Sequence, residues 1–470
     1  MDQLAHSTVD GETSSQSSQK RSLSYLLLLF YLAMLFLRPY DLIPALKILH
    51  LPMVSGGLCF AVYIWSRYSG GQKIFPVTPL TRMLLLMTVW AIITMPFSFW
   101  IGGSLKSFWN DWLKMCILFL MLGNVLQSAK NVQGALWMCI VSATCISSLA
   151  IALKVLLGES VADGRLVTDA SGVYSGPNLF SMTLILLLPY VLFFFFLHTK
   201  LWVRLFCGFA IAAFTIANML TESRAGTFGE VLVVVLVFWK LRGWGVGLMK
   251  TVGISLLAAI LFLPFAPKGL WERFSTVLAG SDVVLDPNSK AGSALGSKLQ
   301  REELLVHAVI LTAENPILGV GMNNFAAKSH ERFNTRAEDW VGCHNTFLQV
   351  SSELGIPGLV LYLLLLGAAW KTVRLPGKQM SPHDRELPEN RQFRILSDAT
   401  VISFIGYVLF STLAHLAYEP YFFVVGGIAE SLRNIYMGSA VPAPLEVPLG
   451  TWAVSSVMPI LVKASASRTE

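Results

Sequence analysis

Long apolar runs, repeated along most of the chain, constrain its fold more than any other feature. A membrane-crossing helix needs about 20 predominantly apolar residues, because the hydrocarbon core of a bilayer is about 30 Å thick. Runs of roughly this kind occur at 22–41, 44–66, 81–101, 108–127, 132–157, 178–198, 201–221, 226–240, 246–265, 345–370, 396–417 and 420–438. We therefore expect an all-α polytopic membrane protein with about 12 transmembrane helices in a lipid bilayer.

Composition and charge agree with a membrane protein. Only 13% of the residues are charged, about half the fraction found in an ordinary soluble domain. The net charge of +7 comes largely from lysine and arginine in short connections between apolar runs. Such connections face the cytoplasm by the positive-inside rule, so the basic balance does not call for nucleic acid as a partner. The basic connection 371–395 is the strongest indication of a cytoplasmic side, and the even number of spans places both termini there.

The chain divides into a membrane body and two tails. Residues 1–20 are polar and Ser-rich, which predicts a disordered cytoplasmic tail before a first helix that acts as an uncleaved signal anchor. Residues 21–440 form the expected membrane body. Residues 441–470 are read as a largely separate C-terminal tail.

The connection 266–344 is the long polar segment on the opposite, non-cytoplasmic face. Connections of this length are usually either functional or disordered. Its second half, "KLQREELLVHAVILTAENPILGVGMNNF", has helical apolar spacing and then a Pro/Gly turn. We expect an ordered helix from about Leu299 to Ala313, ending before Asn315-Pro316.

Two arginines are candidate ligands for an anion. Arg224 stands in "TESRAGTF" between two apolar runs, where a guanidinium has to be paired, hydrated or bound to an anionic ligand. A snorkelling side chain or a pair with Glu222 would explain it equally well. Arg301 stands in the first turn of the expected helix, where the helix dipole does not favour a cation. The competing interpretation is a solvated charge beside two glutamates.

His344 and Asn345 open the apolar run at 345–370. A helix that starts there has free backbone N–H groups that favour an anion, and a neutral imidazole can accept a proton. The residues Gly355 to Gly358, "GIPG", predict a kink that turns the His344 end across the membrane surface. Simple helix capping is the alternative. Glu353, between His344 and the expected kink, is expected either to be a buried partner for a basic group or to be hydrated in a cavity.

Asn178 follows Gly176-Pro177 and is expected to cap the next helix. We find no phosphate-binding glycine loop, HExxH pattern, Asp-rich metal motif or zinc spacing of cysteines. The expected chemistry is therefore independent of metals and cofactors.

Four stretches resemble the bacterial O-antigen ligase and O-antigen polymerase family of membrane glycosyltransferases. They are "GRLVTDASGVYSGPNLF", "TESRAG", "REELLVHAVILTAENPILGVGMNNF" and "CHNTFLQVSSELGIPGLVLYLLLL", which together span roughly 164–370. The resemblance implies a GT-C-like membrane fold in the bacterial inner membrane, with its active face in the periplasm. It also implies transfer of a glycan from undecaprenyl diphosphate to an acceptor hydroxyl.

Residue by residue, the resemblance implies that Arg224 and Arg301 engage the donor diphosphate and that His344 is the catalytic histidine. Asn345, Asn178 and Glu353 are possible supporting residues. Three other arginines of the long connection could replace Arg301, namely Arg273, Arg332 and Arg336. The acceptor implied is lipid A-core for a ligase, a further glycan repeat for a polymerase, or a protein hydroxyl for an O-glycosylation ligase.

The main rival from another class is a transporter of a lipid-linked glycan or an organic anion. Alternating access usually places the binding site near the midplane between internal repeats. Here no repeat is evident by eye, and the polar residues gather on one face. A purely structural scaffold would not need arginines and a histidine on the same face.

Overall fold

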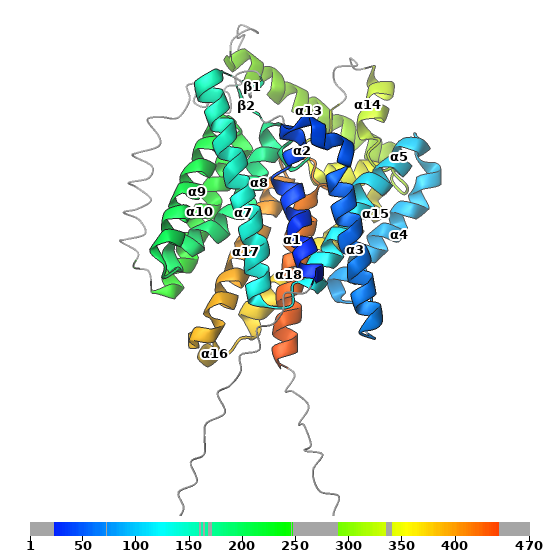
Figure 1. Ribbon diagram of the computed structural model, residues 1–470. Coiled ribbons are helices and arrows are strands. Elements are labelled where there is room, and N and C mark those ends of the chain that lie inside the picture. Colours follow the sequence, from blue (N-terminus) through cyan, green and yellow to red (C-terminus); the bar gives the residue numbers. More distant parts are fainter. Residues whose placement is uncertain are drawn as a thin grey trace, which may run out of the picture.

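The structure is a computed structural model, and it describes residues 23–71, 73–158, 161–162, 165–167, 172–245, 247, 290–334 and 341–440. Within these ranges the chain forms a helical body with one short antiparallel hairpin, in which Val161 pairs with Leu166. Figure 1 shows α13 and the hairpin at one end of the body and α16 at the other. The expected tails at 1–20 and 441–470 lie outside the described residues, as does the apolar run 246–265 except for Gly247.

The first part of the chain contributes three long helices and several short ones. These elements are α1 (Leu23–Phe36), α2 (Pro39–Leu42), η1 (Pro44–Leu49), α3 (Leu51–Ser69), α4 (Pro79–Thr94), η2 (Met95–Phe97), α5 (Ile101–Ser107), the π-helical η3 (Phe108–Leu113), α6 (Lys114–Val125), α7 (Ala129–Ala152) and the π-helical η4 (Leu153–Leu157).

The second part begins with the hairpin and ends with two long helices. These elements are β1 (Val161–Ala162), β2 (Arg165–Leu166), η5 (Gly172–Tyr174), α8 (Gly176–Leu197), α9 (Leu201–Leu220), α10 (Arg224–Leu241), η6 (Arg242–Trp244), α13 (Lys290–Glu314), α14 (Phe325–Phe333), α15 (Thr346–Gln379), α16 (Pro382–Glu386), η9 (Pro388–Asn390), α17 (Arg391–Ser411) and α18 (Pro420–Ala440).

Seven helical segments in the described part of the chain are long and apolar enough to cross a membrane. They are Ala45–Ser69, Pro79–Phe97, Ala129–Leu157, Gly176–Leu197, Leu201–Leu220, Thr346–Gln379 and Arg391–Ser411. These segments confirm an all-α, multi-pass membrane architecture. A total of twelve spans and a GT-C-like arrangement stay predictions.

Backbone breaks interrupt two of the expected spans. The run 22–41 is interrupted where Arg38 adopts a left-handed conformation (φ 50°) before Pro39, so α1 has 14 residues and rises only about 21 Å. The run 44–66 is divided in the same way at His50 (φ 43°), with Pro52 in the first turn of α3. Proline is tolerated in a first helical turn, which is why each new helix starts there.

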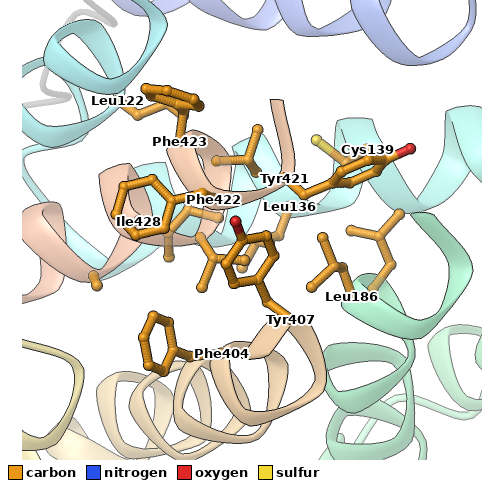
Figure 2. Packing of buried hydrophobic residues seen from close by; sticks show 14 of the residues in the cluster. Leu122, Leu136, Cys139, Leu186, Phe404, Tyr407, Tyr421, Phe422, Phe423 and Ile428 are labelled. Atoms are coloured by element: carbon orange, nitrogen blue, oxygen red, sulfur yellow. The ribbon is translucent and has the colours of Figure 1, made fainter. Parts of the chain in front are cut away.

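Aromatic packing joins the last two helices to the rest of the body. Figure 2 shows Tyr407 of α17 beside Phe422 of α18, with Leu136 of α7 and Leu186 of α8 in the same cluster. The rings of Tyr407 and Phe422 are 5.8 Å apart between centroids. The Tyr407 hydroxyl also lies 2.7 Å from that of Tyr362 in α15. Because α17 and α18 are held on both sides, the loop that joins them has a fixed position.

The kink expected in α15 is present at Gly355, whose φ of 72° and ψ of 179° interrupt the helix. Glycine is required because this conformation excludes a Cβ atom, and a Cβ here would lie 2.1 Å from the carbonyl oxygen of Ile317. The kink therefore depends on close backbone contact with the turn that follows α13.

That turn also satisfies the carbonyl groups that the kink frees. The Ser352 oxygen accepts from the Val320 N–H (2.8 Å), and the Glu353 oxygen accepts from the Gly321 N–H (2.9 Å). The Leu354 oxygen accepts from the Trp90 indole at 2.8 Å. The "GVG" stretch thus acts as a backbone partner for the broken helix, which explains the positive φ of Gly319 and Gly321.

The helix expected from Leu299 to Ala313 begins earlier. It starts at Lys290 and ends at Glu314, immediately before Asn315-Pro316. The stop is the expected one, because proline disfavours helical conformation in the residue before it.

Candidate active site

The two ends of the helical body are distinguished by the contacts of α10 and α15. Lys240 and Trp244, at the end of α10, contact Asp398 at 3.0 and 3.1 Å. Trp244 also lines a cavity together with Pro376, near the end of α15. Both helices therefore end beside the basic connection, near α16 (Figure 1). An 18-residue helix is roughly 27 Å long, so Arg224 lies at the opposite end, where α15 also begins.

His344 stands beside a second histidine, His415, in the loop between α17 and α18. Their ring centroids are 5.2 Å apart, with the ring planes at 65°. The φ of His344 is 52°, a left-handed conformation that is uncommon outside glycine and is often found at functional sites.

Hydrogen bonds from the first turn of α15 hold the His415 loop in place. The Asn345 side-chain nitrogen donates to the Thr412 carbonyl at 3.1 Å. The Thr346 hydroxyl donates to the Ala414 carbonyl at 2.7 Å and accepts from the Leu416 N–H at 2.9 Å. The loop is therefore tied to α15 on both sides of His415.

A close backbone approach completes this arrangement. A Cβ atom added at Gly342 would lie 2.7 Å from the His415 ring, which is too close for any other residue without a shift of the ring. Gly342 is thus required for the ring to pack beside the segment that carries His344.

Burial and positive charge lower the proton affinity of both histidines. The pKa of His344 is lowered to about 3, first by burial, then by the charge of Arg301 and then by His415. The pKa of His415 is also lowered, first by burial and then by Arg301. Both imidazoles are therefore neutral near pH 7, and Arg301 is close enough to act on each of them.

The three arginines considered as alternatives to Arg301 are not placed beside His344 in the described part of the chain. Arg332 forms an exposed ion pair with Glu314 at 2.9 Å, while Arg273 and Arg336 lie outside the described residues. Among the described arginines of the long connection, Arg301 is the one whose charge acts on His344.

The turn that carries Arg224 is held by polar groups from an earlier segment. The Ser223 hydroxyl caps α10 by accepting from the Gly226 N–H at 3.1 Å and donates to the Asn178 side-chain oxygen at 2.8 Å. Arg165 donates to the Thr221 carbonyl at 2.8 Å. These contacts fix the start of α10, and Arg165 was not among the residues expected at the site.

The expectation that Asn178 caps α8 is wrong. This helix begins at Gly176 with Ser175 in the cap position, because Pro177 takes the first turn and places Asn178 inside the helix. Its side chain is then free to accept the hydrogen bond from Ser223. Asn178 therefore connects α8 to the Arg224 turn.

Asn345 caps α15, which confirms the capping alternative for this residue over free N–H groups at the helix start. Its side-chain oxygen accepts from the Phe347 N–H at 2.9 Å and from the Leu348 N–H at 3.0 Å. Because the protein itself satisfies these two donors, fewer free N–H groups remain in the first turn of α15 to bind an anion than the sequence indicated.

Within the described residues, Glu353 is buried and bound by backbone N–H groups. Its side chain is 2% exposed and accepts from the backbone N–H groups of Asn323 at 2.9 Å and Phe325 at 3.3 Å. It therefore holds the turn before α14 onto α15. Backbone groups therefore take the place expected for a basic side chain.

A cavity of about 310 Å³ opens beside His415, lined among others by Arg38, Asp111, Gln349, Tyr418 and Glu419. The pKa of Glu419 is raised to about 7, first by burial and then by the negative charge of Asp111. Sequence reasoning missed His415 and Glu419, although the polar letters of "STLAHLAYEP" between two apolar runs were a signal for them.

Comparison with known proteins identifies one matching region. Residues 208–363 match a family model described as O-antigen ligase. This region covers about a third of the chain and includes Arg224, Arg301, His344, Asn345 and Glu353, whereas Asn178 precedes it and His415 and Glu419 follow it. No curated protein matches the chain. The family match confirms the resemblance drawn from the motifs: over residues 208–363, the chain is similar to the O-antigen ligase and polymerase family of membrane proteins.

Proposed function

We propose that this protein is a membrane glycosyltransferase of the O-antigen ligase or polymerase type. It transfers a glycan from an undecaprenyl-diphosphate carrier to an acceptor hydroxyl at the periplasmic face of the bacterial inner membrane, in surface polysaccharide or lipopolysaccharide assembly. One observation carries the proposal. His344 lies beside His415, under the charge of Arg301, at the end of the body where Arg224 begins α10.

The reaction is a single displacement at the anomeric carbon. The acceptor oxygen attacks opposite the diphosphate, the bond from the anomeric carbon to the diphosphate oxygen breaks, and its electron pair leaves with the diphosphate. The hydroxyl proton passes to the His344 imidazole. Attack from the opposite face inverts the anomeric configuration. Arg224 and Arg301 stabilise the diphosphate as its negative charge grows in the transition state.

The low proton affinity of His344 fits a base that is activated by its substrate. In the free protein burial, and then the nearby Arg301 charge, keep the imidazole neutral by lowering its pKa. A diphosphate bound at Arg301 offsets this positive charge and favours the protonated imidazole, which raises the pKa of His344. The base is therefore strongest when the donor is in place.

The basic residues of the 371–395 connection support placing the α16 end in the cytoplasm. In the proposed orientation both termini lie on the cytoplasmic side and His344 lies on the periplasmic side. The acceptor is lipid A-core for a ligase, the next glycan for a polymerase, or a protein hydroxyl for an O-glycosylation ligase.

The test is donor consumption in proteoliposomes that contain undecaprenyl-diphosphate glycan, with and without lipid A-core. We expect wild type to consume donor and His344→Ala to lose turnover. His383→Ala, an exposed histidine of α16 at the other end of the body, is the matched control and should behave as wild type. One long chain added to core identifies a ligase, whereas a ladder of extended donor identifies a polymerase.

The arginine assignment has its own control within one helix. Arg224→Lys removes the planar fork of donors and should impair turnover, because bidentate phosphate contacts need that geometry. Arg242→Lys, beyond the other end of α10, should leave turnover unchanged. If wild type consumes no donor with any acceptor but moves labelled glycan across the bilayer, the transferase proposal fails and a transporter replaces it.

A further inference from the structure

We propose that the cavity beside His415 binds the acceptor saccharide and that Glu419 hydrogen-bonds its hydroxyl groups. This inference rests on the proposed function and names the subsite that its second substrate occupies. We call this space the acceptor cavity, lined among others by Arg38, Asp111, Gln349, His415, Tyr418 and Glu419.

The size and lining of the acceptor cavity suit a sugar. Its volume of about 310 Å³ is at the lower end of the range for small-ligand pockets, which leaves room for the end of a glycan rather than a long chain. Carboxyl, amide and imidazole groups and one aromatic ring line it. Such groups can donate to or accept from hydroxyl groups.

The charge of the acceptor cavity separates it from a diphosphate site. Asp111 and Glu419 both face it, and Arg38, the cation in its lining, is paired with Asp41 at 2.6 Å. Two carboxyl groups disfavour binding of a diphosphate, whereas the positive charge of Arg301 favours it. The diphosphate of the donor is therefore expected near Arg301 and not in this cavity. The cavity therefore suits the uncharged, hydroxyl-bearing partner of the reaction.

One buried atom beside the acceptor cavity lacks a partner. The Nδ1 atom of His415 is buried, and within the described part of the protein it neither accepts nor donates a hydrogen bond. Buried polar atoms are normally satisfied by protein, water or ligand. The His415 ring also lies beside that of His344, 5.2 Å away between centroids, so a saccharide in this cavity would lie near the proposed base.

Glu419 is suited to hold such a hydroxyl. With its pKa raised to about 7 by burial and by Asp111, the side chain is present in both protonation states near neutral pH and can accept or donate. Asp111 itself accepts from the Ser107 hydroxyl at 2.6 Å, which holds its position. Glu419 is therefore the carboxyl group best placed to bind the acceptor.

The kinetic test compares Glu419→Gln with Glu386→Gln in proteoliposomes. Glu386 is an exposed glutamate of α16 at the other end of the body, so its variant controls for loss of one negative charge. With lipid A-core varied at saturating undecaprenyl-diphosphate glycan, we expect Glu419→Gln to raise the KM for the acceptor about tenfold. The KM for the donor should stay unchanged. A merely structural role would lower the maximal rate through loss of folded protein and leave both KM values unchanged. A changed donor KM or an unchanged acceptor KM would overturn the inference.

A second measurement reports binding without turnover. Asn110 is exposed and lines the acceptor cavity, so Asn110→Cys in a Cys145→Ser background provides a thiol at its edge. Lipid A-core should slow maleimide labelling of this thiol severalfold, and it should not slow labelling of Lys106→Cys, an exposed position of α5.

The two measurements separate the inference from the proposed function. If wild type transfers no glycan but lipid A-core protects Asn110→Cys, the proposed function fails and the saccharide site stands. If wild type transfers glycan to lipid A-core while that thiol is not protected, the acceptor binds elsewhere and the inference fails alone. Where wild type extends the donor itself, undecaprenyl-diphosphate glycan serves as the acceptor probe in both measurements.

Discussion

The rings of His344 and His415 lie 5.2 Å apart, although one precedes α15 and the other follows α17. The pairing depends on the bonds from Asn345 and Thr346 to the loop that carries His415. It also gives His344 an environment in which burial, a cation and a second imidazole all lower its pKa. Several measurable consequences arise from this arrangement.

The acid limbs of the two kinetic pH profiles should differ. The profile of kcat/KM reports the free protein and that of kcat reports the substrate complex. In the free protein the pKa of His344 is about 3, so kcat/KM should not fall from protonation of this base until the pH is well below 5. Because bound diphosphate raises the pKa, kcat should fall at a higher pH. Identical acid limbs would contradict activation by the donor.

Arg301→Gln should lower kcat/KM about 100-fold or more, as expected when a charged group that stabilises the transition state is removed. It should also raise the pKa of His344 in the free protein, since the Arg301 charge lowers it. The matched variant is Arg332→Gln, which breaks an exposed ion pair with Glu314 and should change stability by less than about 1 kcal/mol. If both variants lost the same fraction of kcat/KM, the proposal that Arg301 acts in the site would be wrong.

Gly355→Ala should destabilise the protein by about 2 kcal/mol or more, because a side chain at this φ is strained and its Cβ meets the Ile317 carbonyl. Gly367→Ala is the control in the same helix. A Cβ there meets no atom within 4 Å, so alanine should be neutral or slightly stabilising. Thermal unfolding in detergent measures both, and a Gly355 variant as stable as wild type would mean that the kink is not needed.

Glu353→Gln should lower stability by about 1–3 kcal/mol, because an amide nitrogen replaces one of the two oxygens that accept backbone N–H groups. We expect a lower melting temperature with the acceptor and donor KM values unchanged. Glu386→Gln, exposed in α16, should leave the melting temperature unchanged. If Glu353→Gln changed either KM while the melting temperature stayed normal, Glu353 would have a role in substrate binding.

Removal of metal ions should not affect transfer. The proposed mechanism places the diphosphate charge on Arg224 and Arg301 and the proton on His344. We therefore expect EDTA-treated protein in metal-free buffer to retain turnover, and loss that Mg²⁺ or Mn²⁺ restores would show that a metal takes part.

Much of the architecture could be predicted from local sequence patterns. Membrane helices can be predicted from long apolar runs, because the property that defines them lies in consecutive residues. The Gly355–Gly358 kink and the helix stop before Asn315-Pro316 are equally local, since they depend on backbone preferences of glycine and proline. The interruption at Arg38 has no such local signal, because an apolar composition continues across the break in backbone conformation.

Local patterns mislead where tertiary hydrogen bonds compete. Asn178 has a residue type that favours a cap, yet its side chain bonds to Ser223 from another helix. Glu353 looks like half of a buried ion pair, yet backbone N–H groups satisfy it. No pattern within a single segment distinguishes these outcomes.

The amino-acid sequence by itself determined the class of protein, a multi-pass helical membrane protein, and the motifs of residues 208–363 that resemble O-antigen ligases. Only the tertiary structure decided which groups surround His344. His415 and Glu419 belong to a loop whose place depends on the packing of α17 and α18 against other helices and on bonds from α15. Such contacts join residues far apart in the chain, so neither spacing nor periodicity records them.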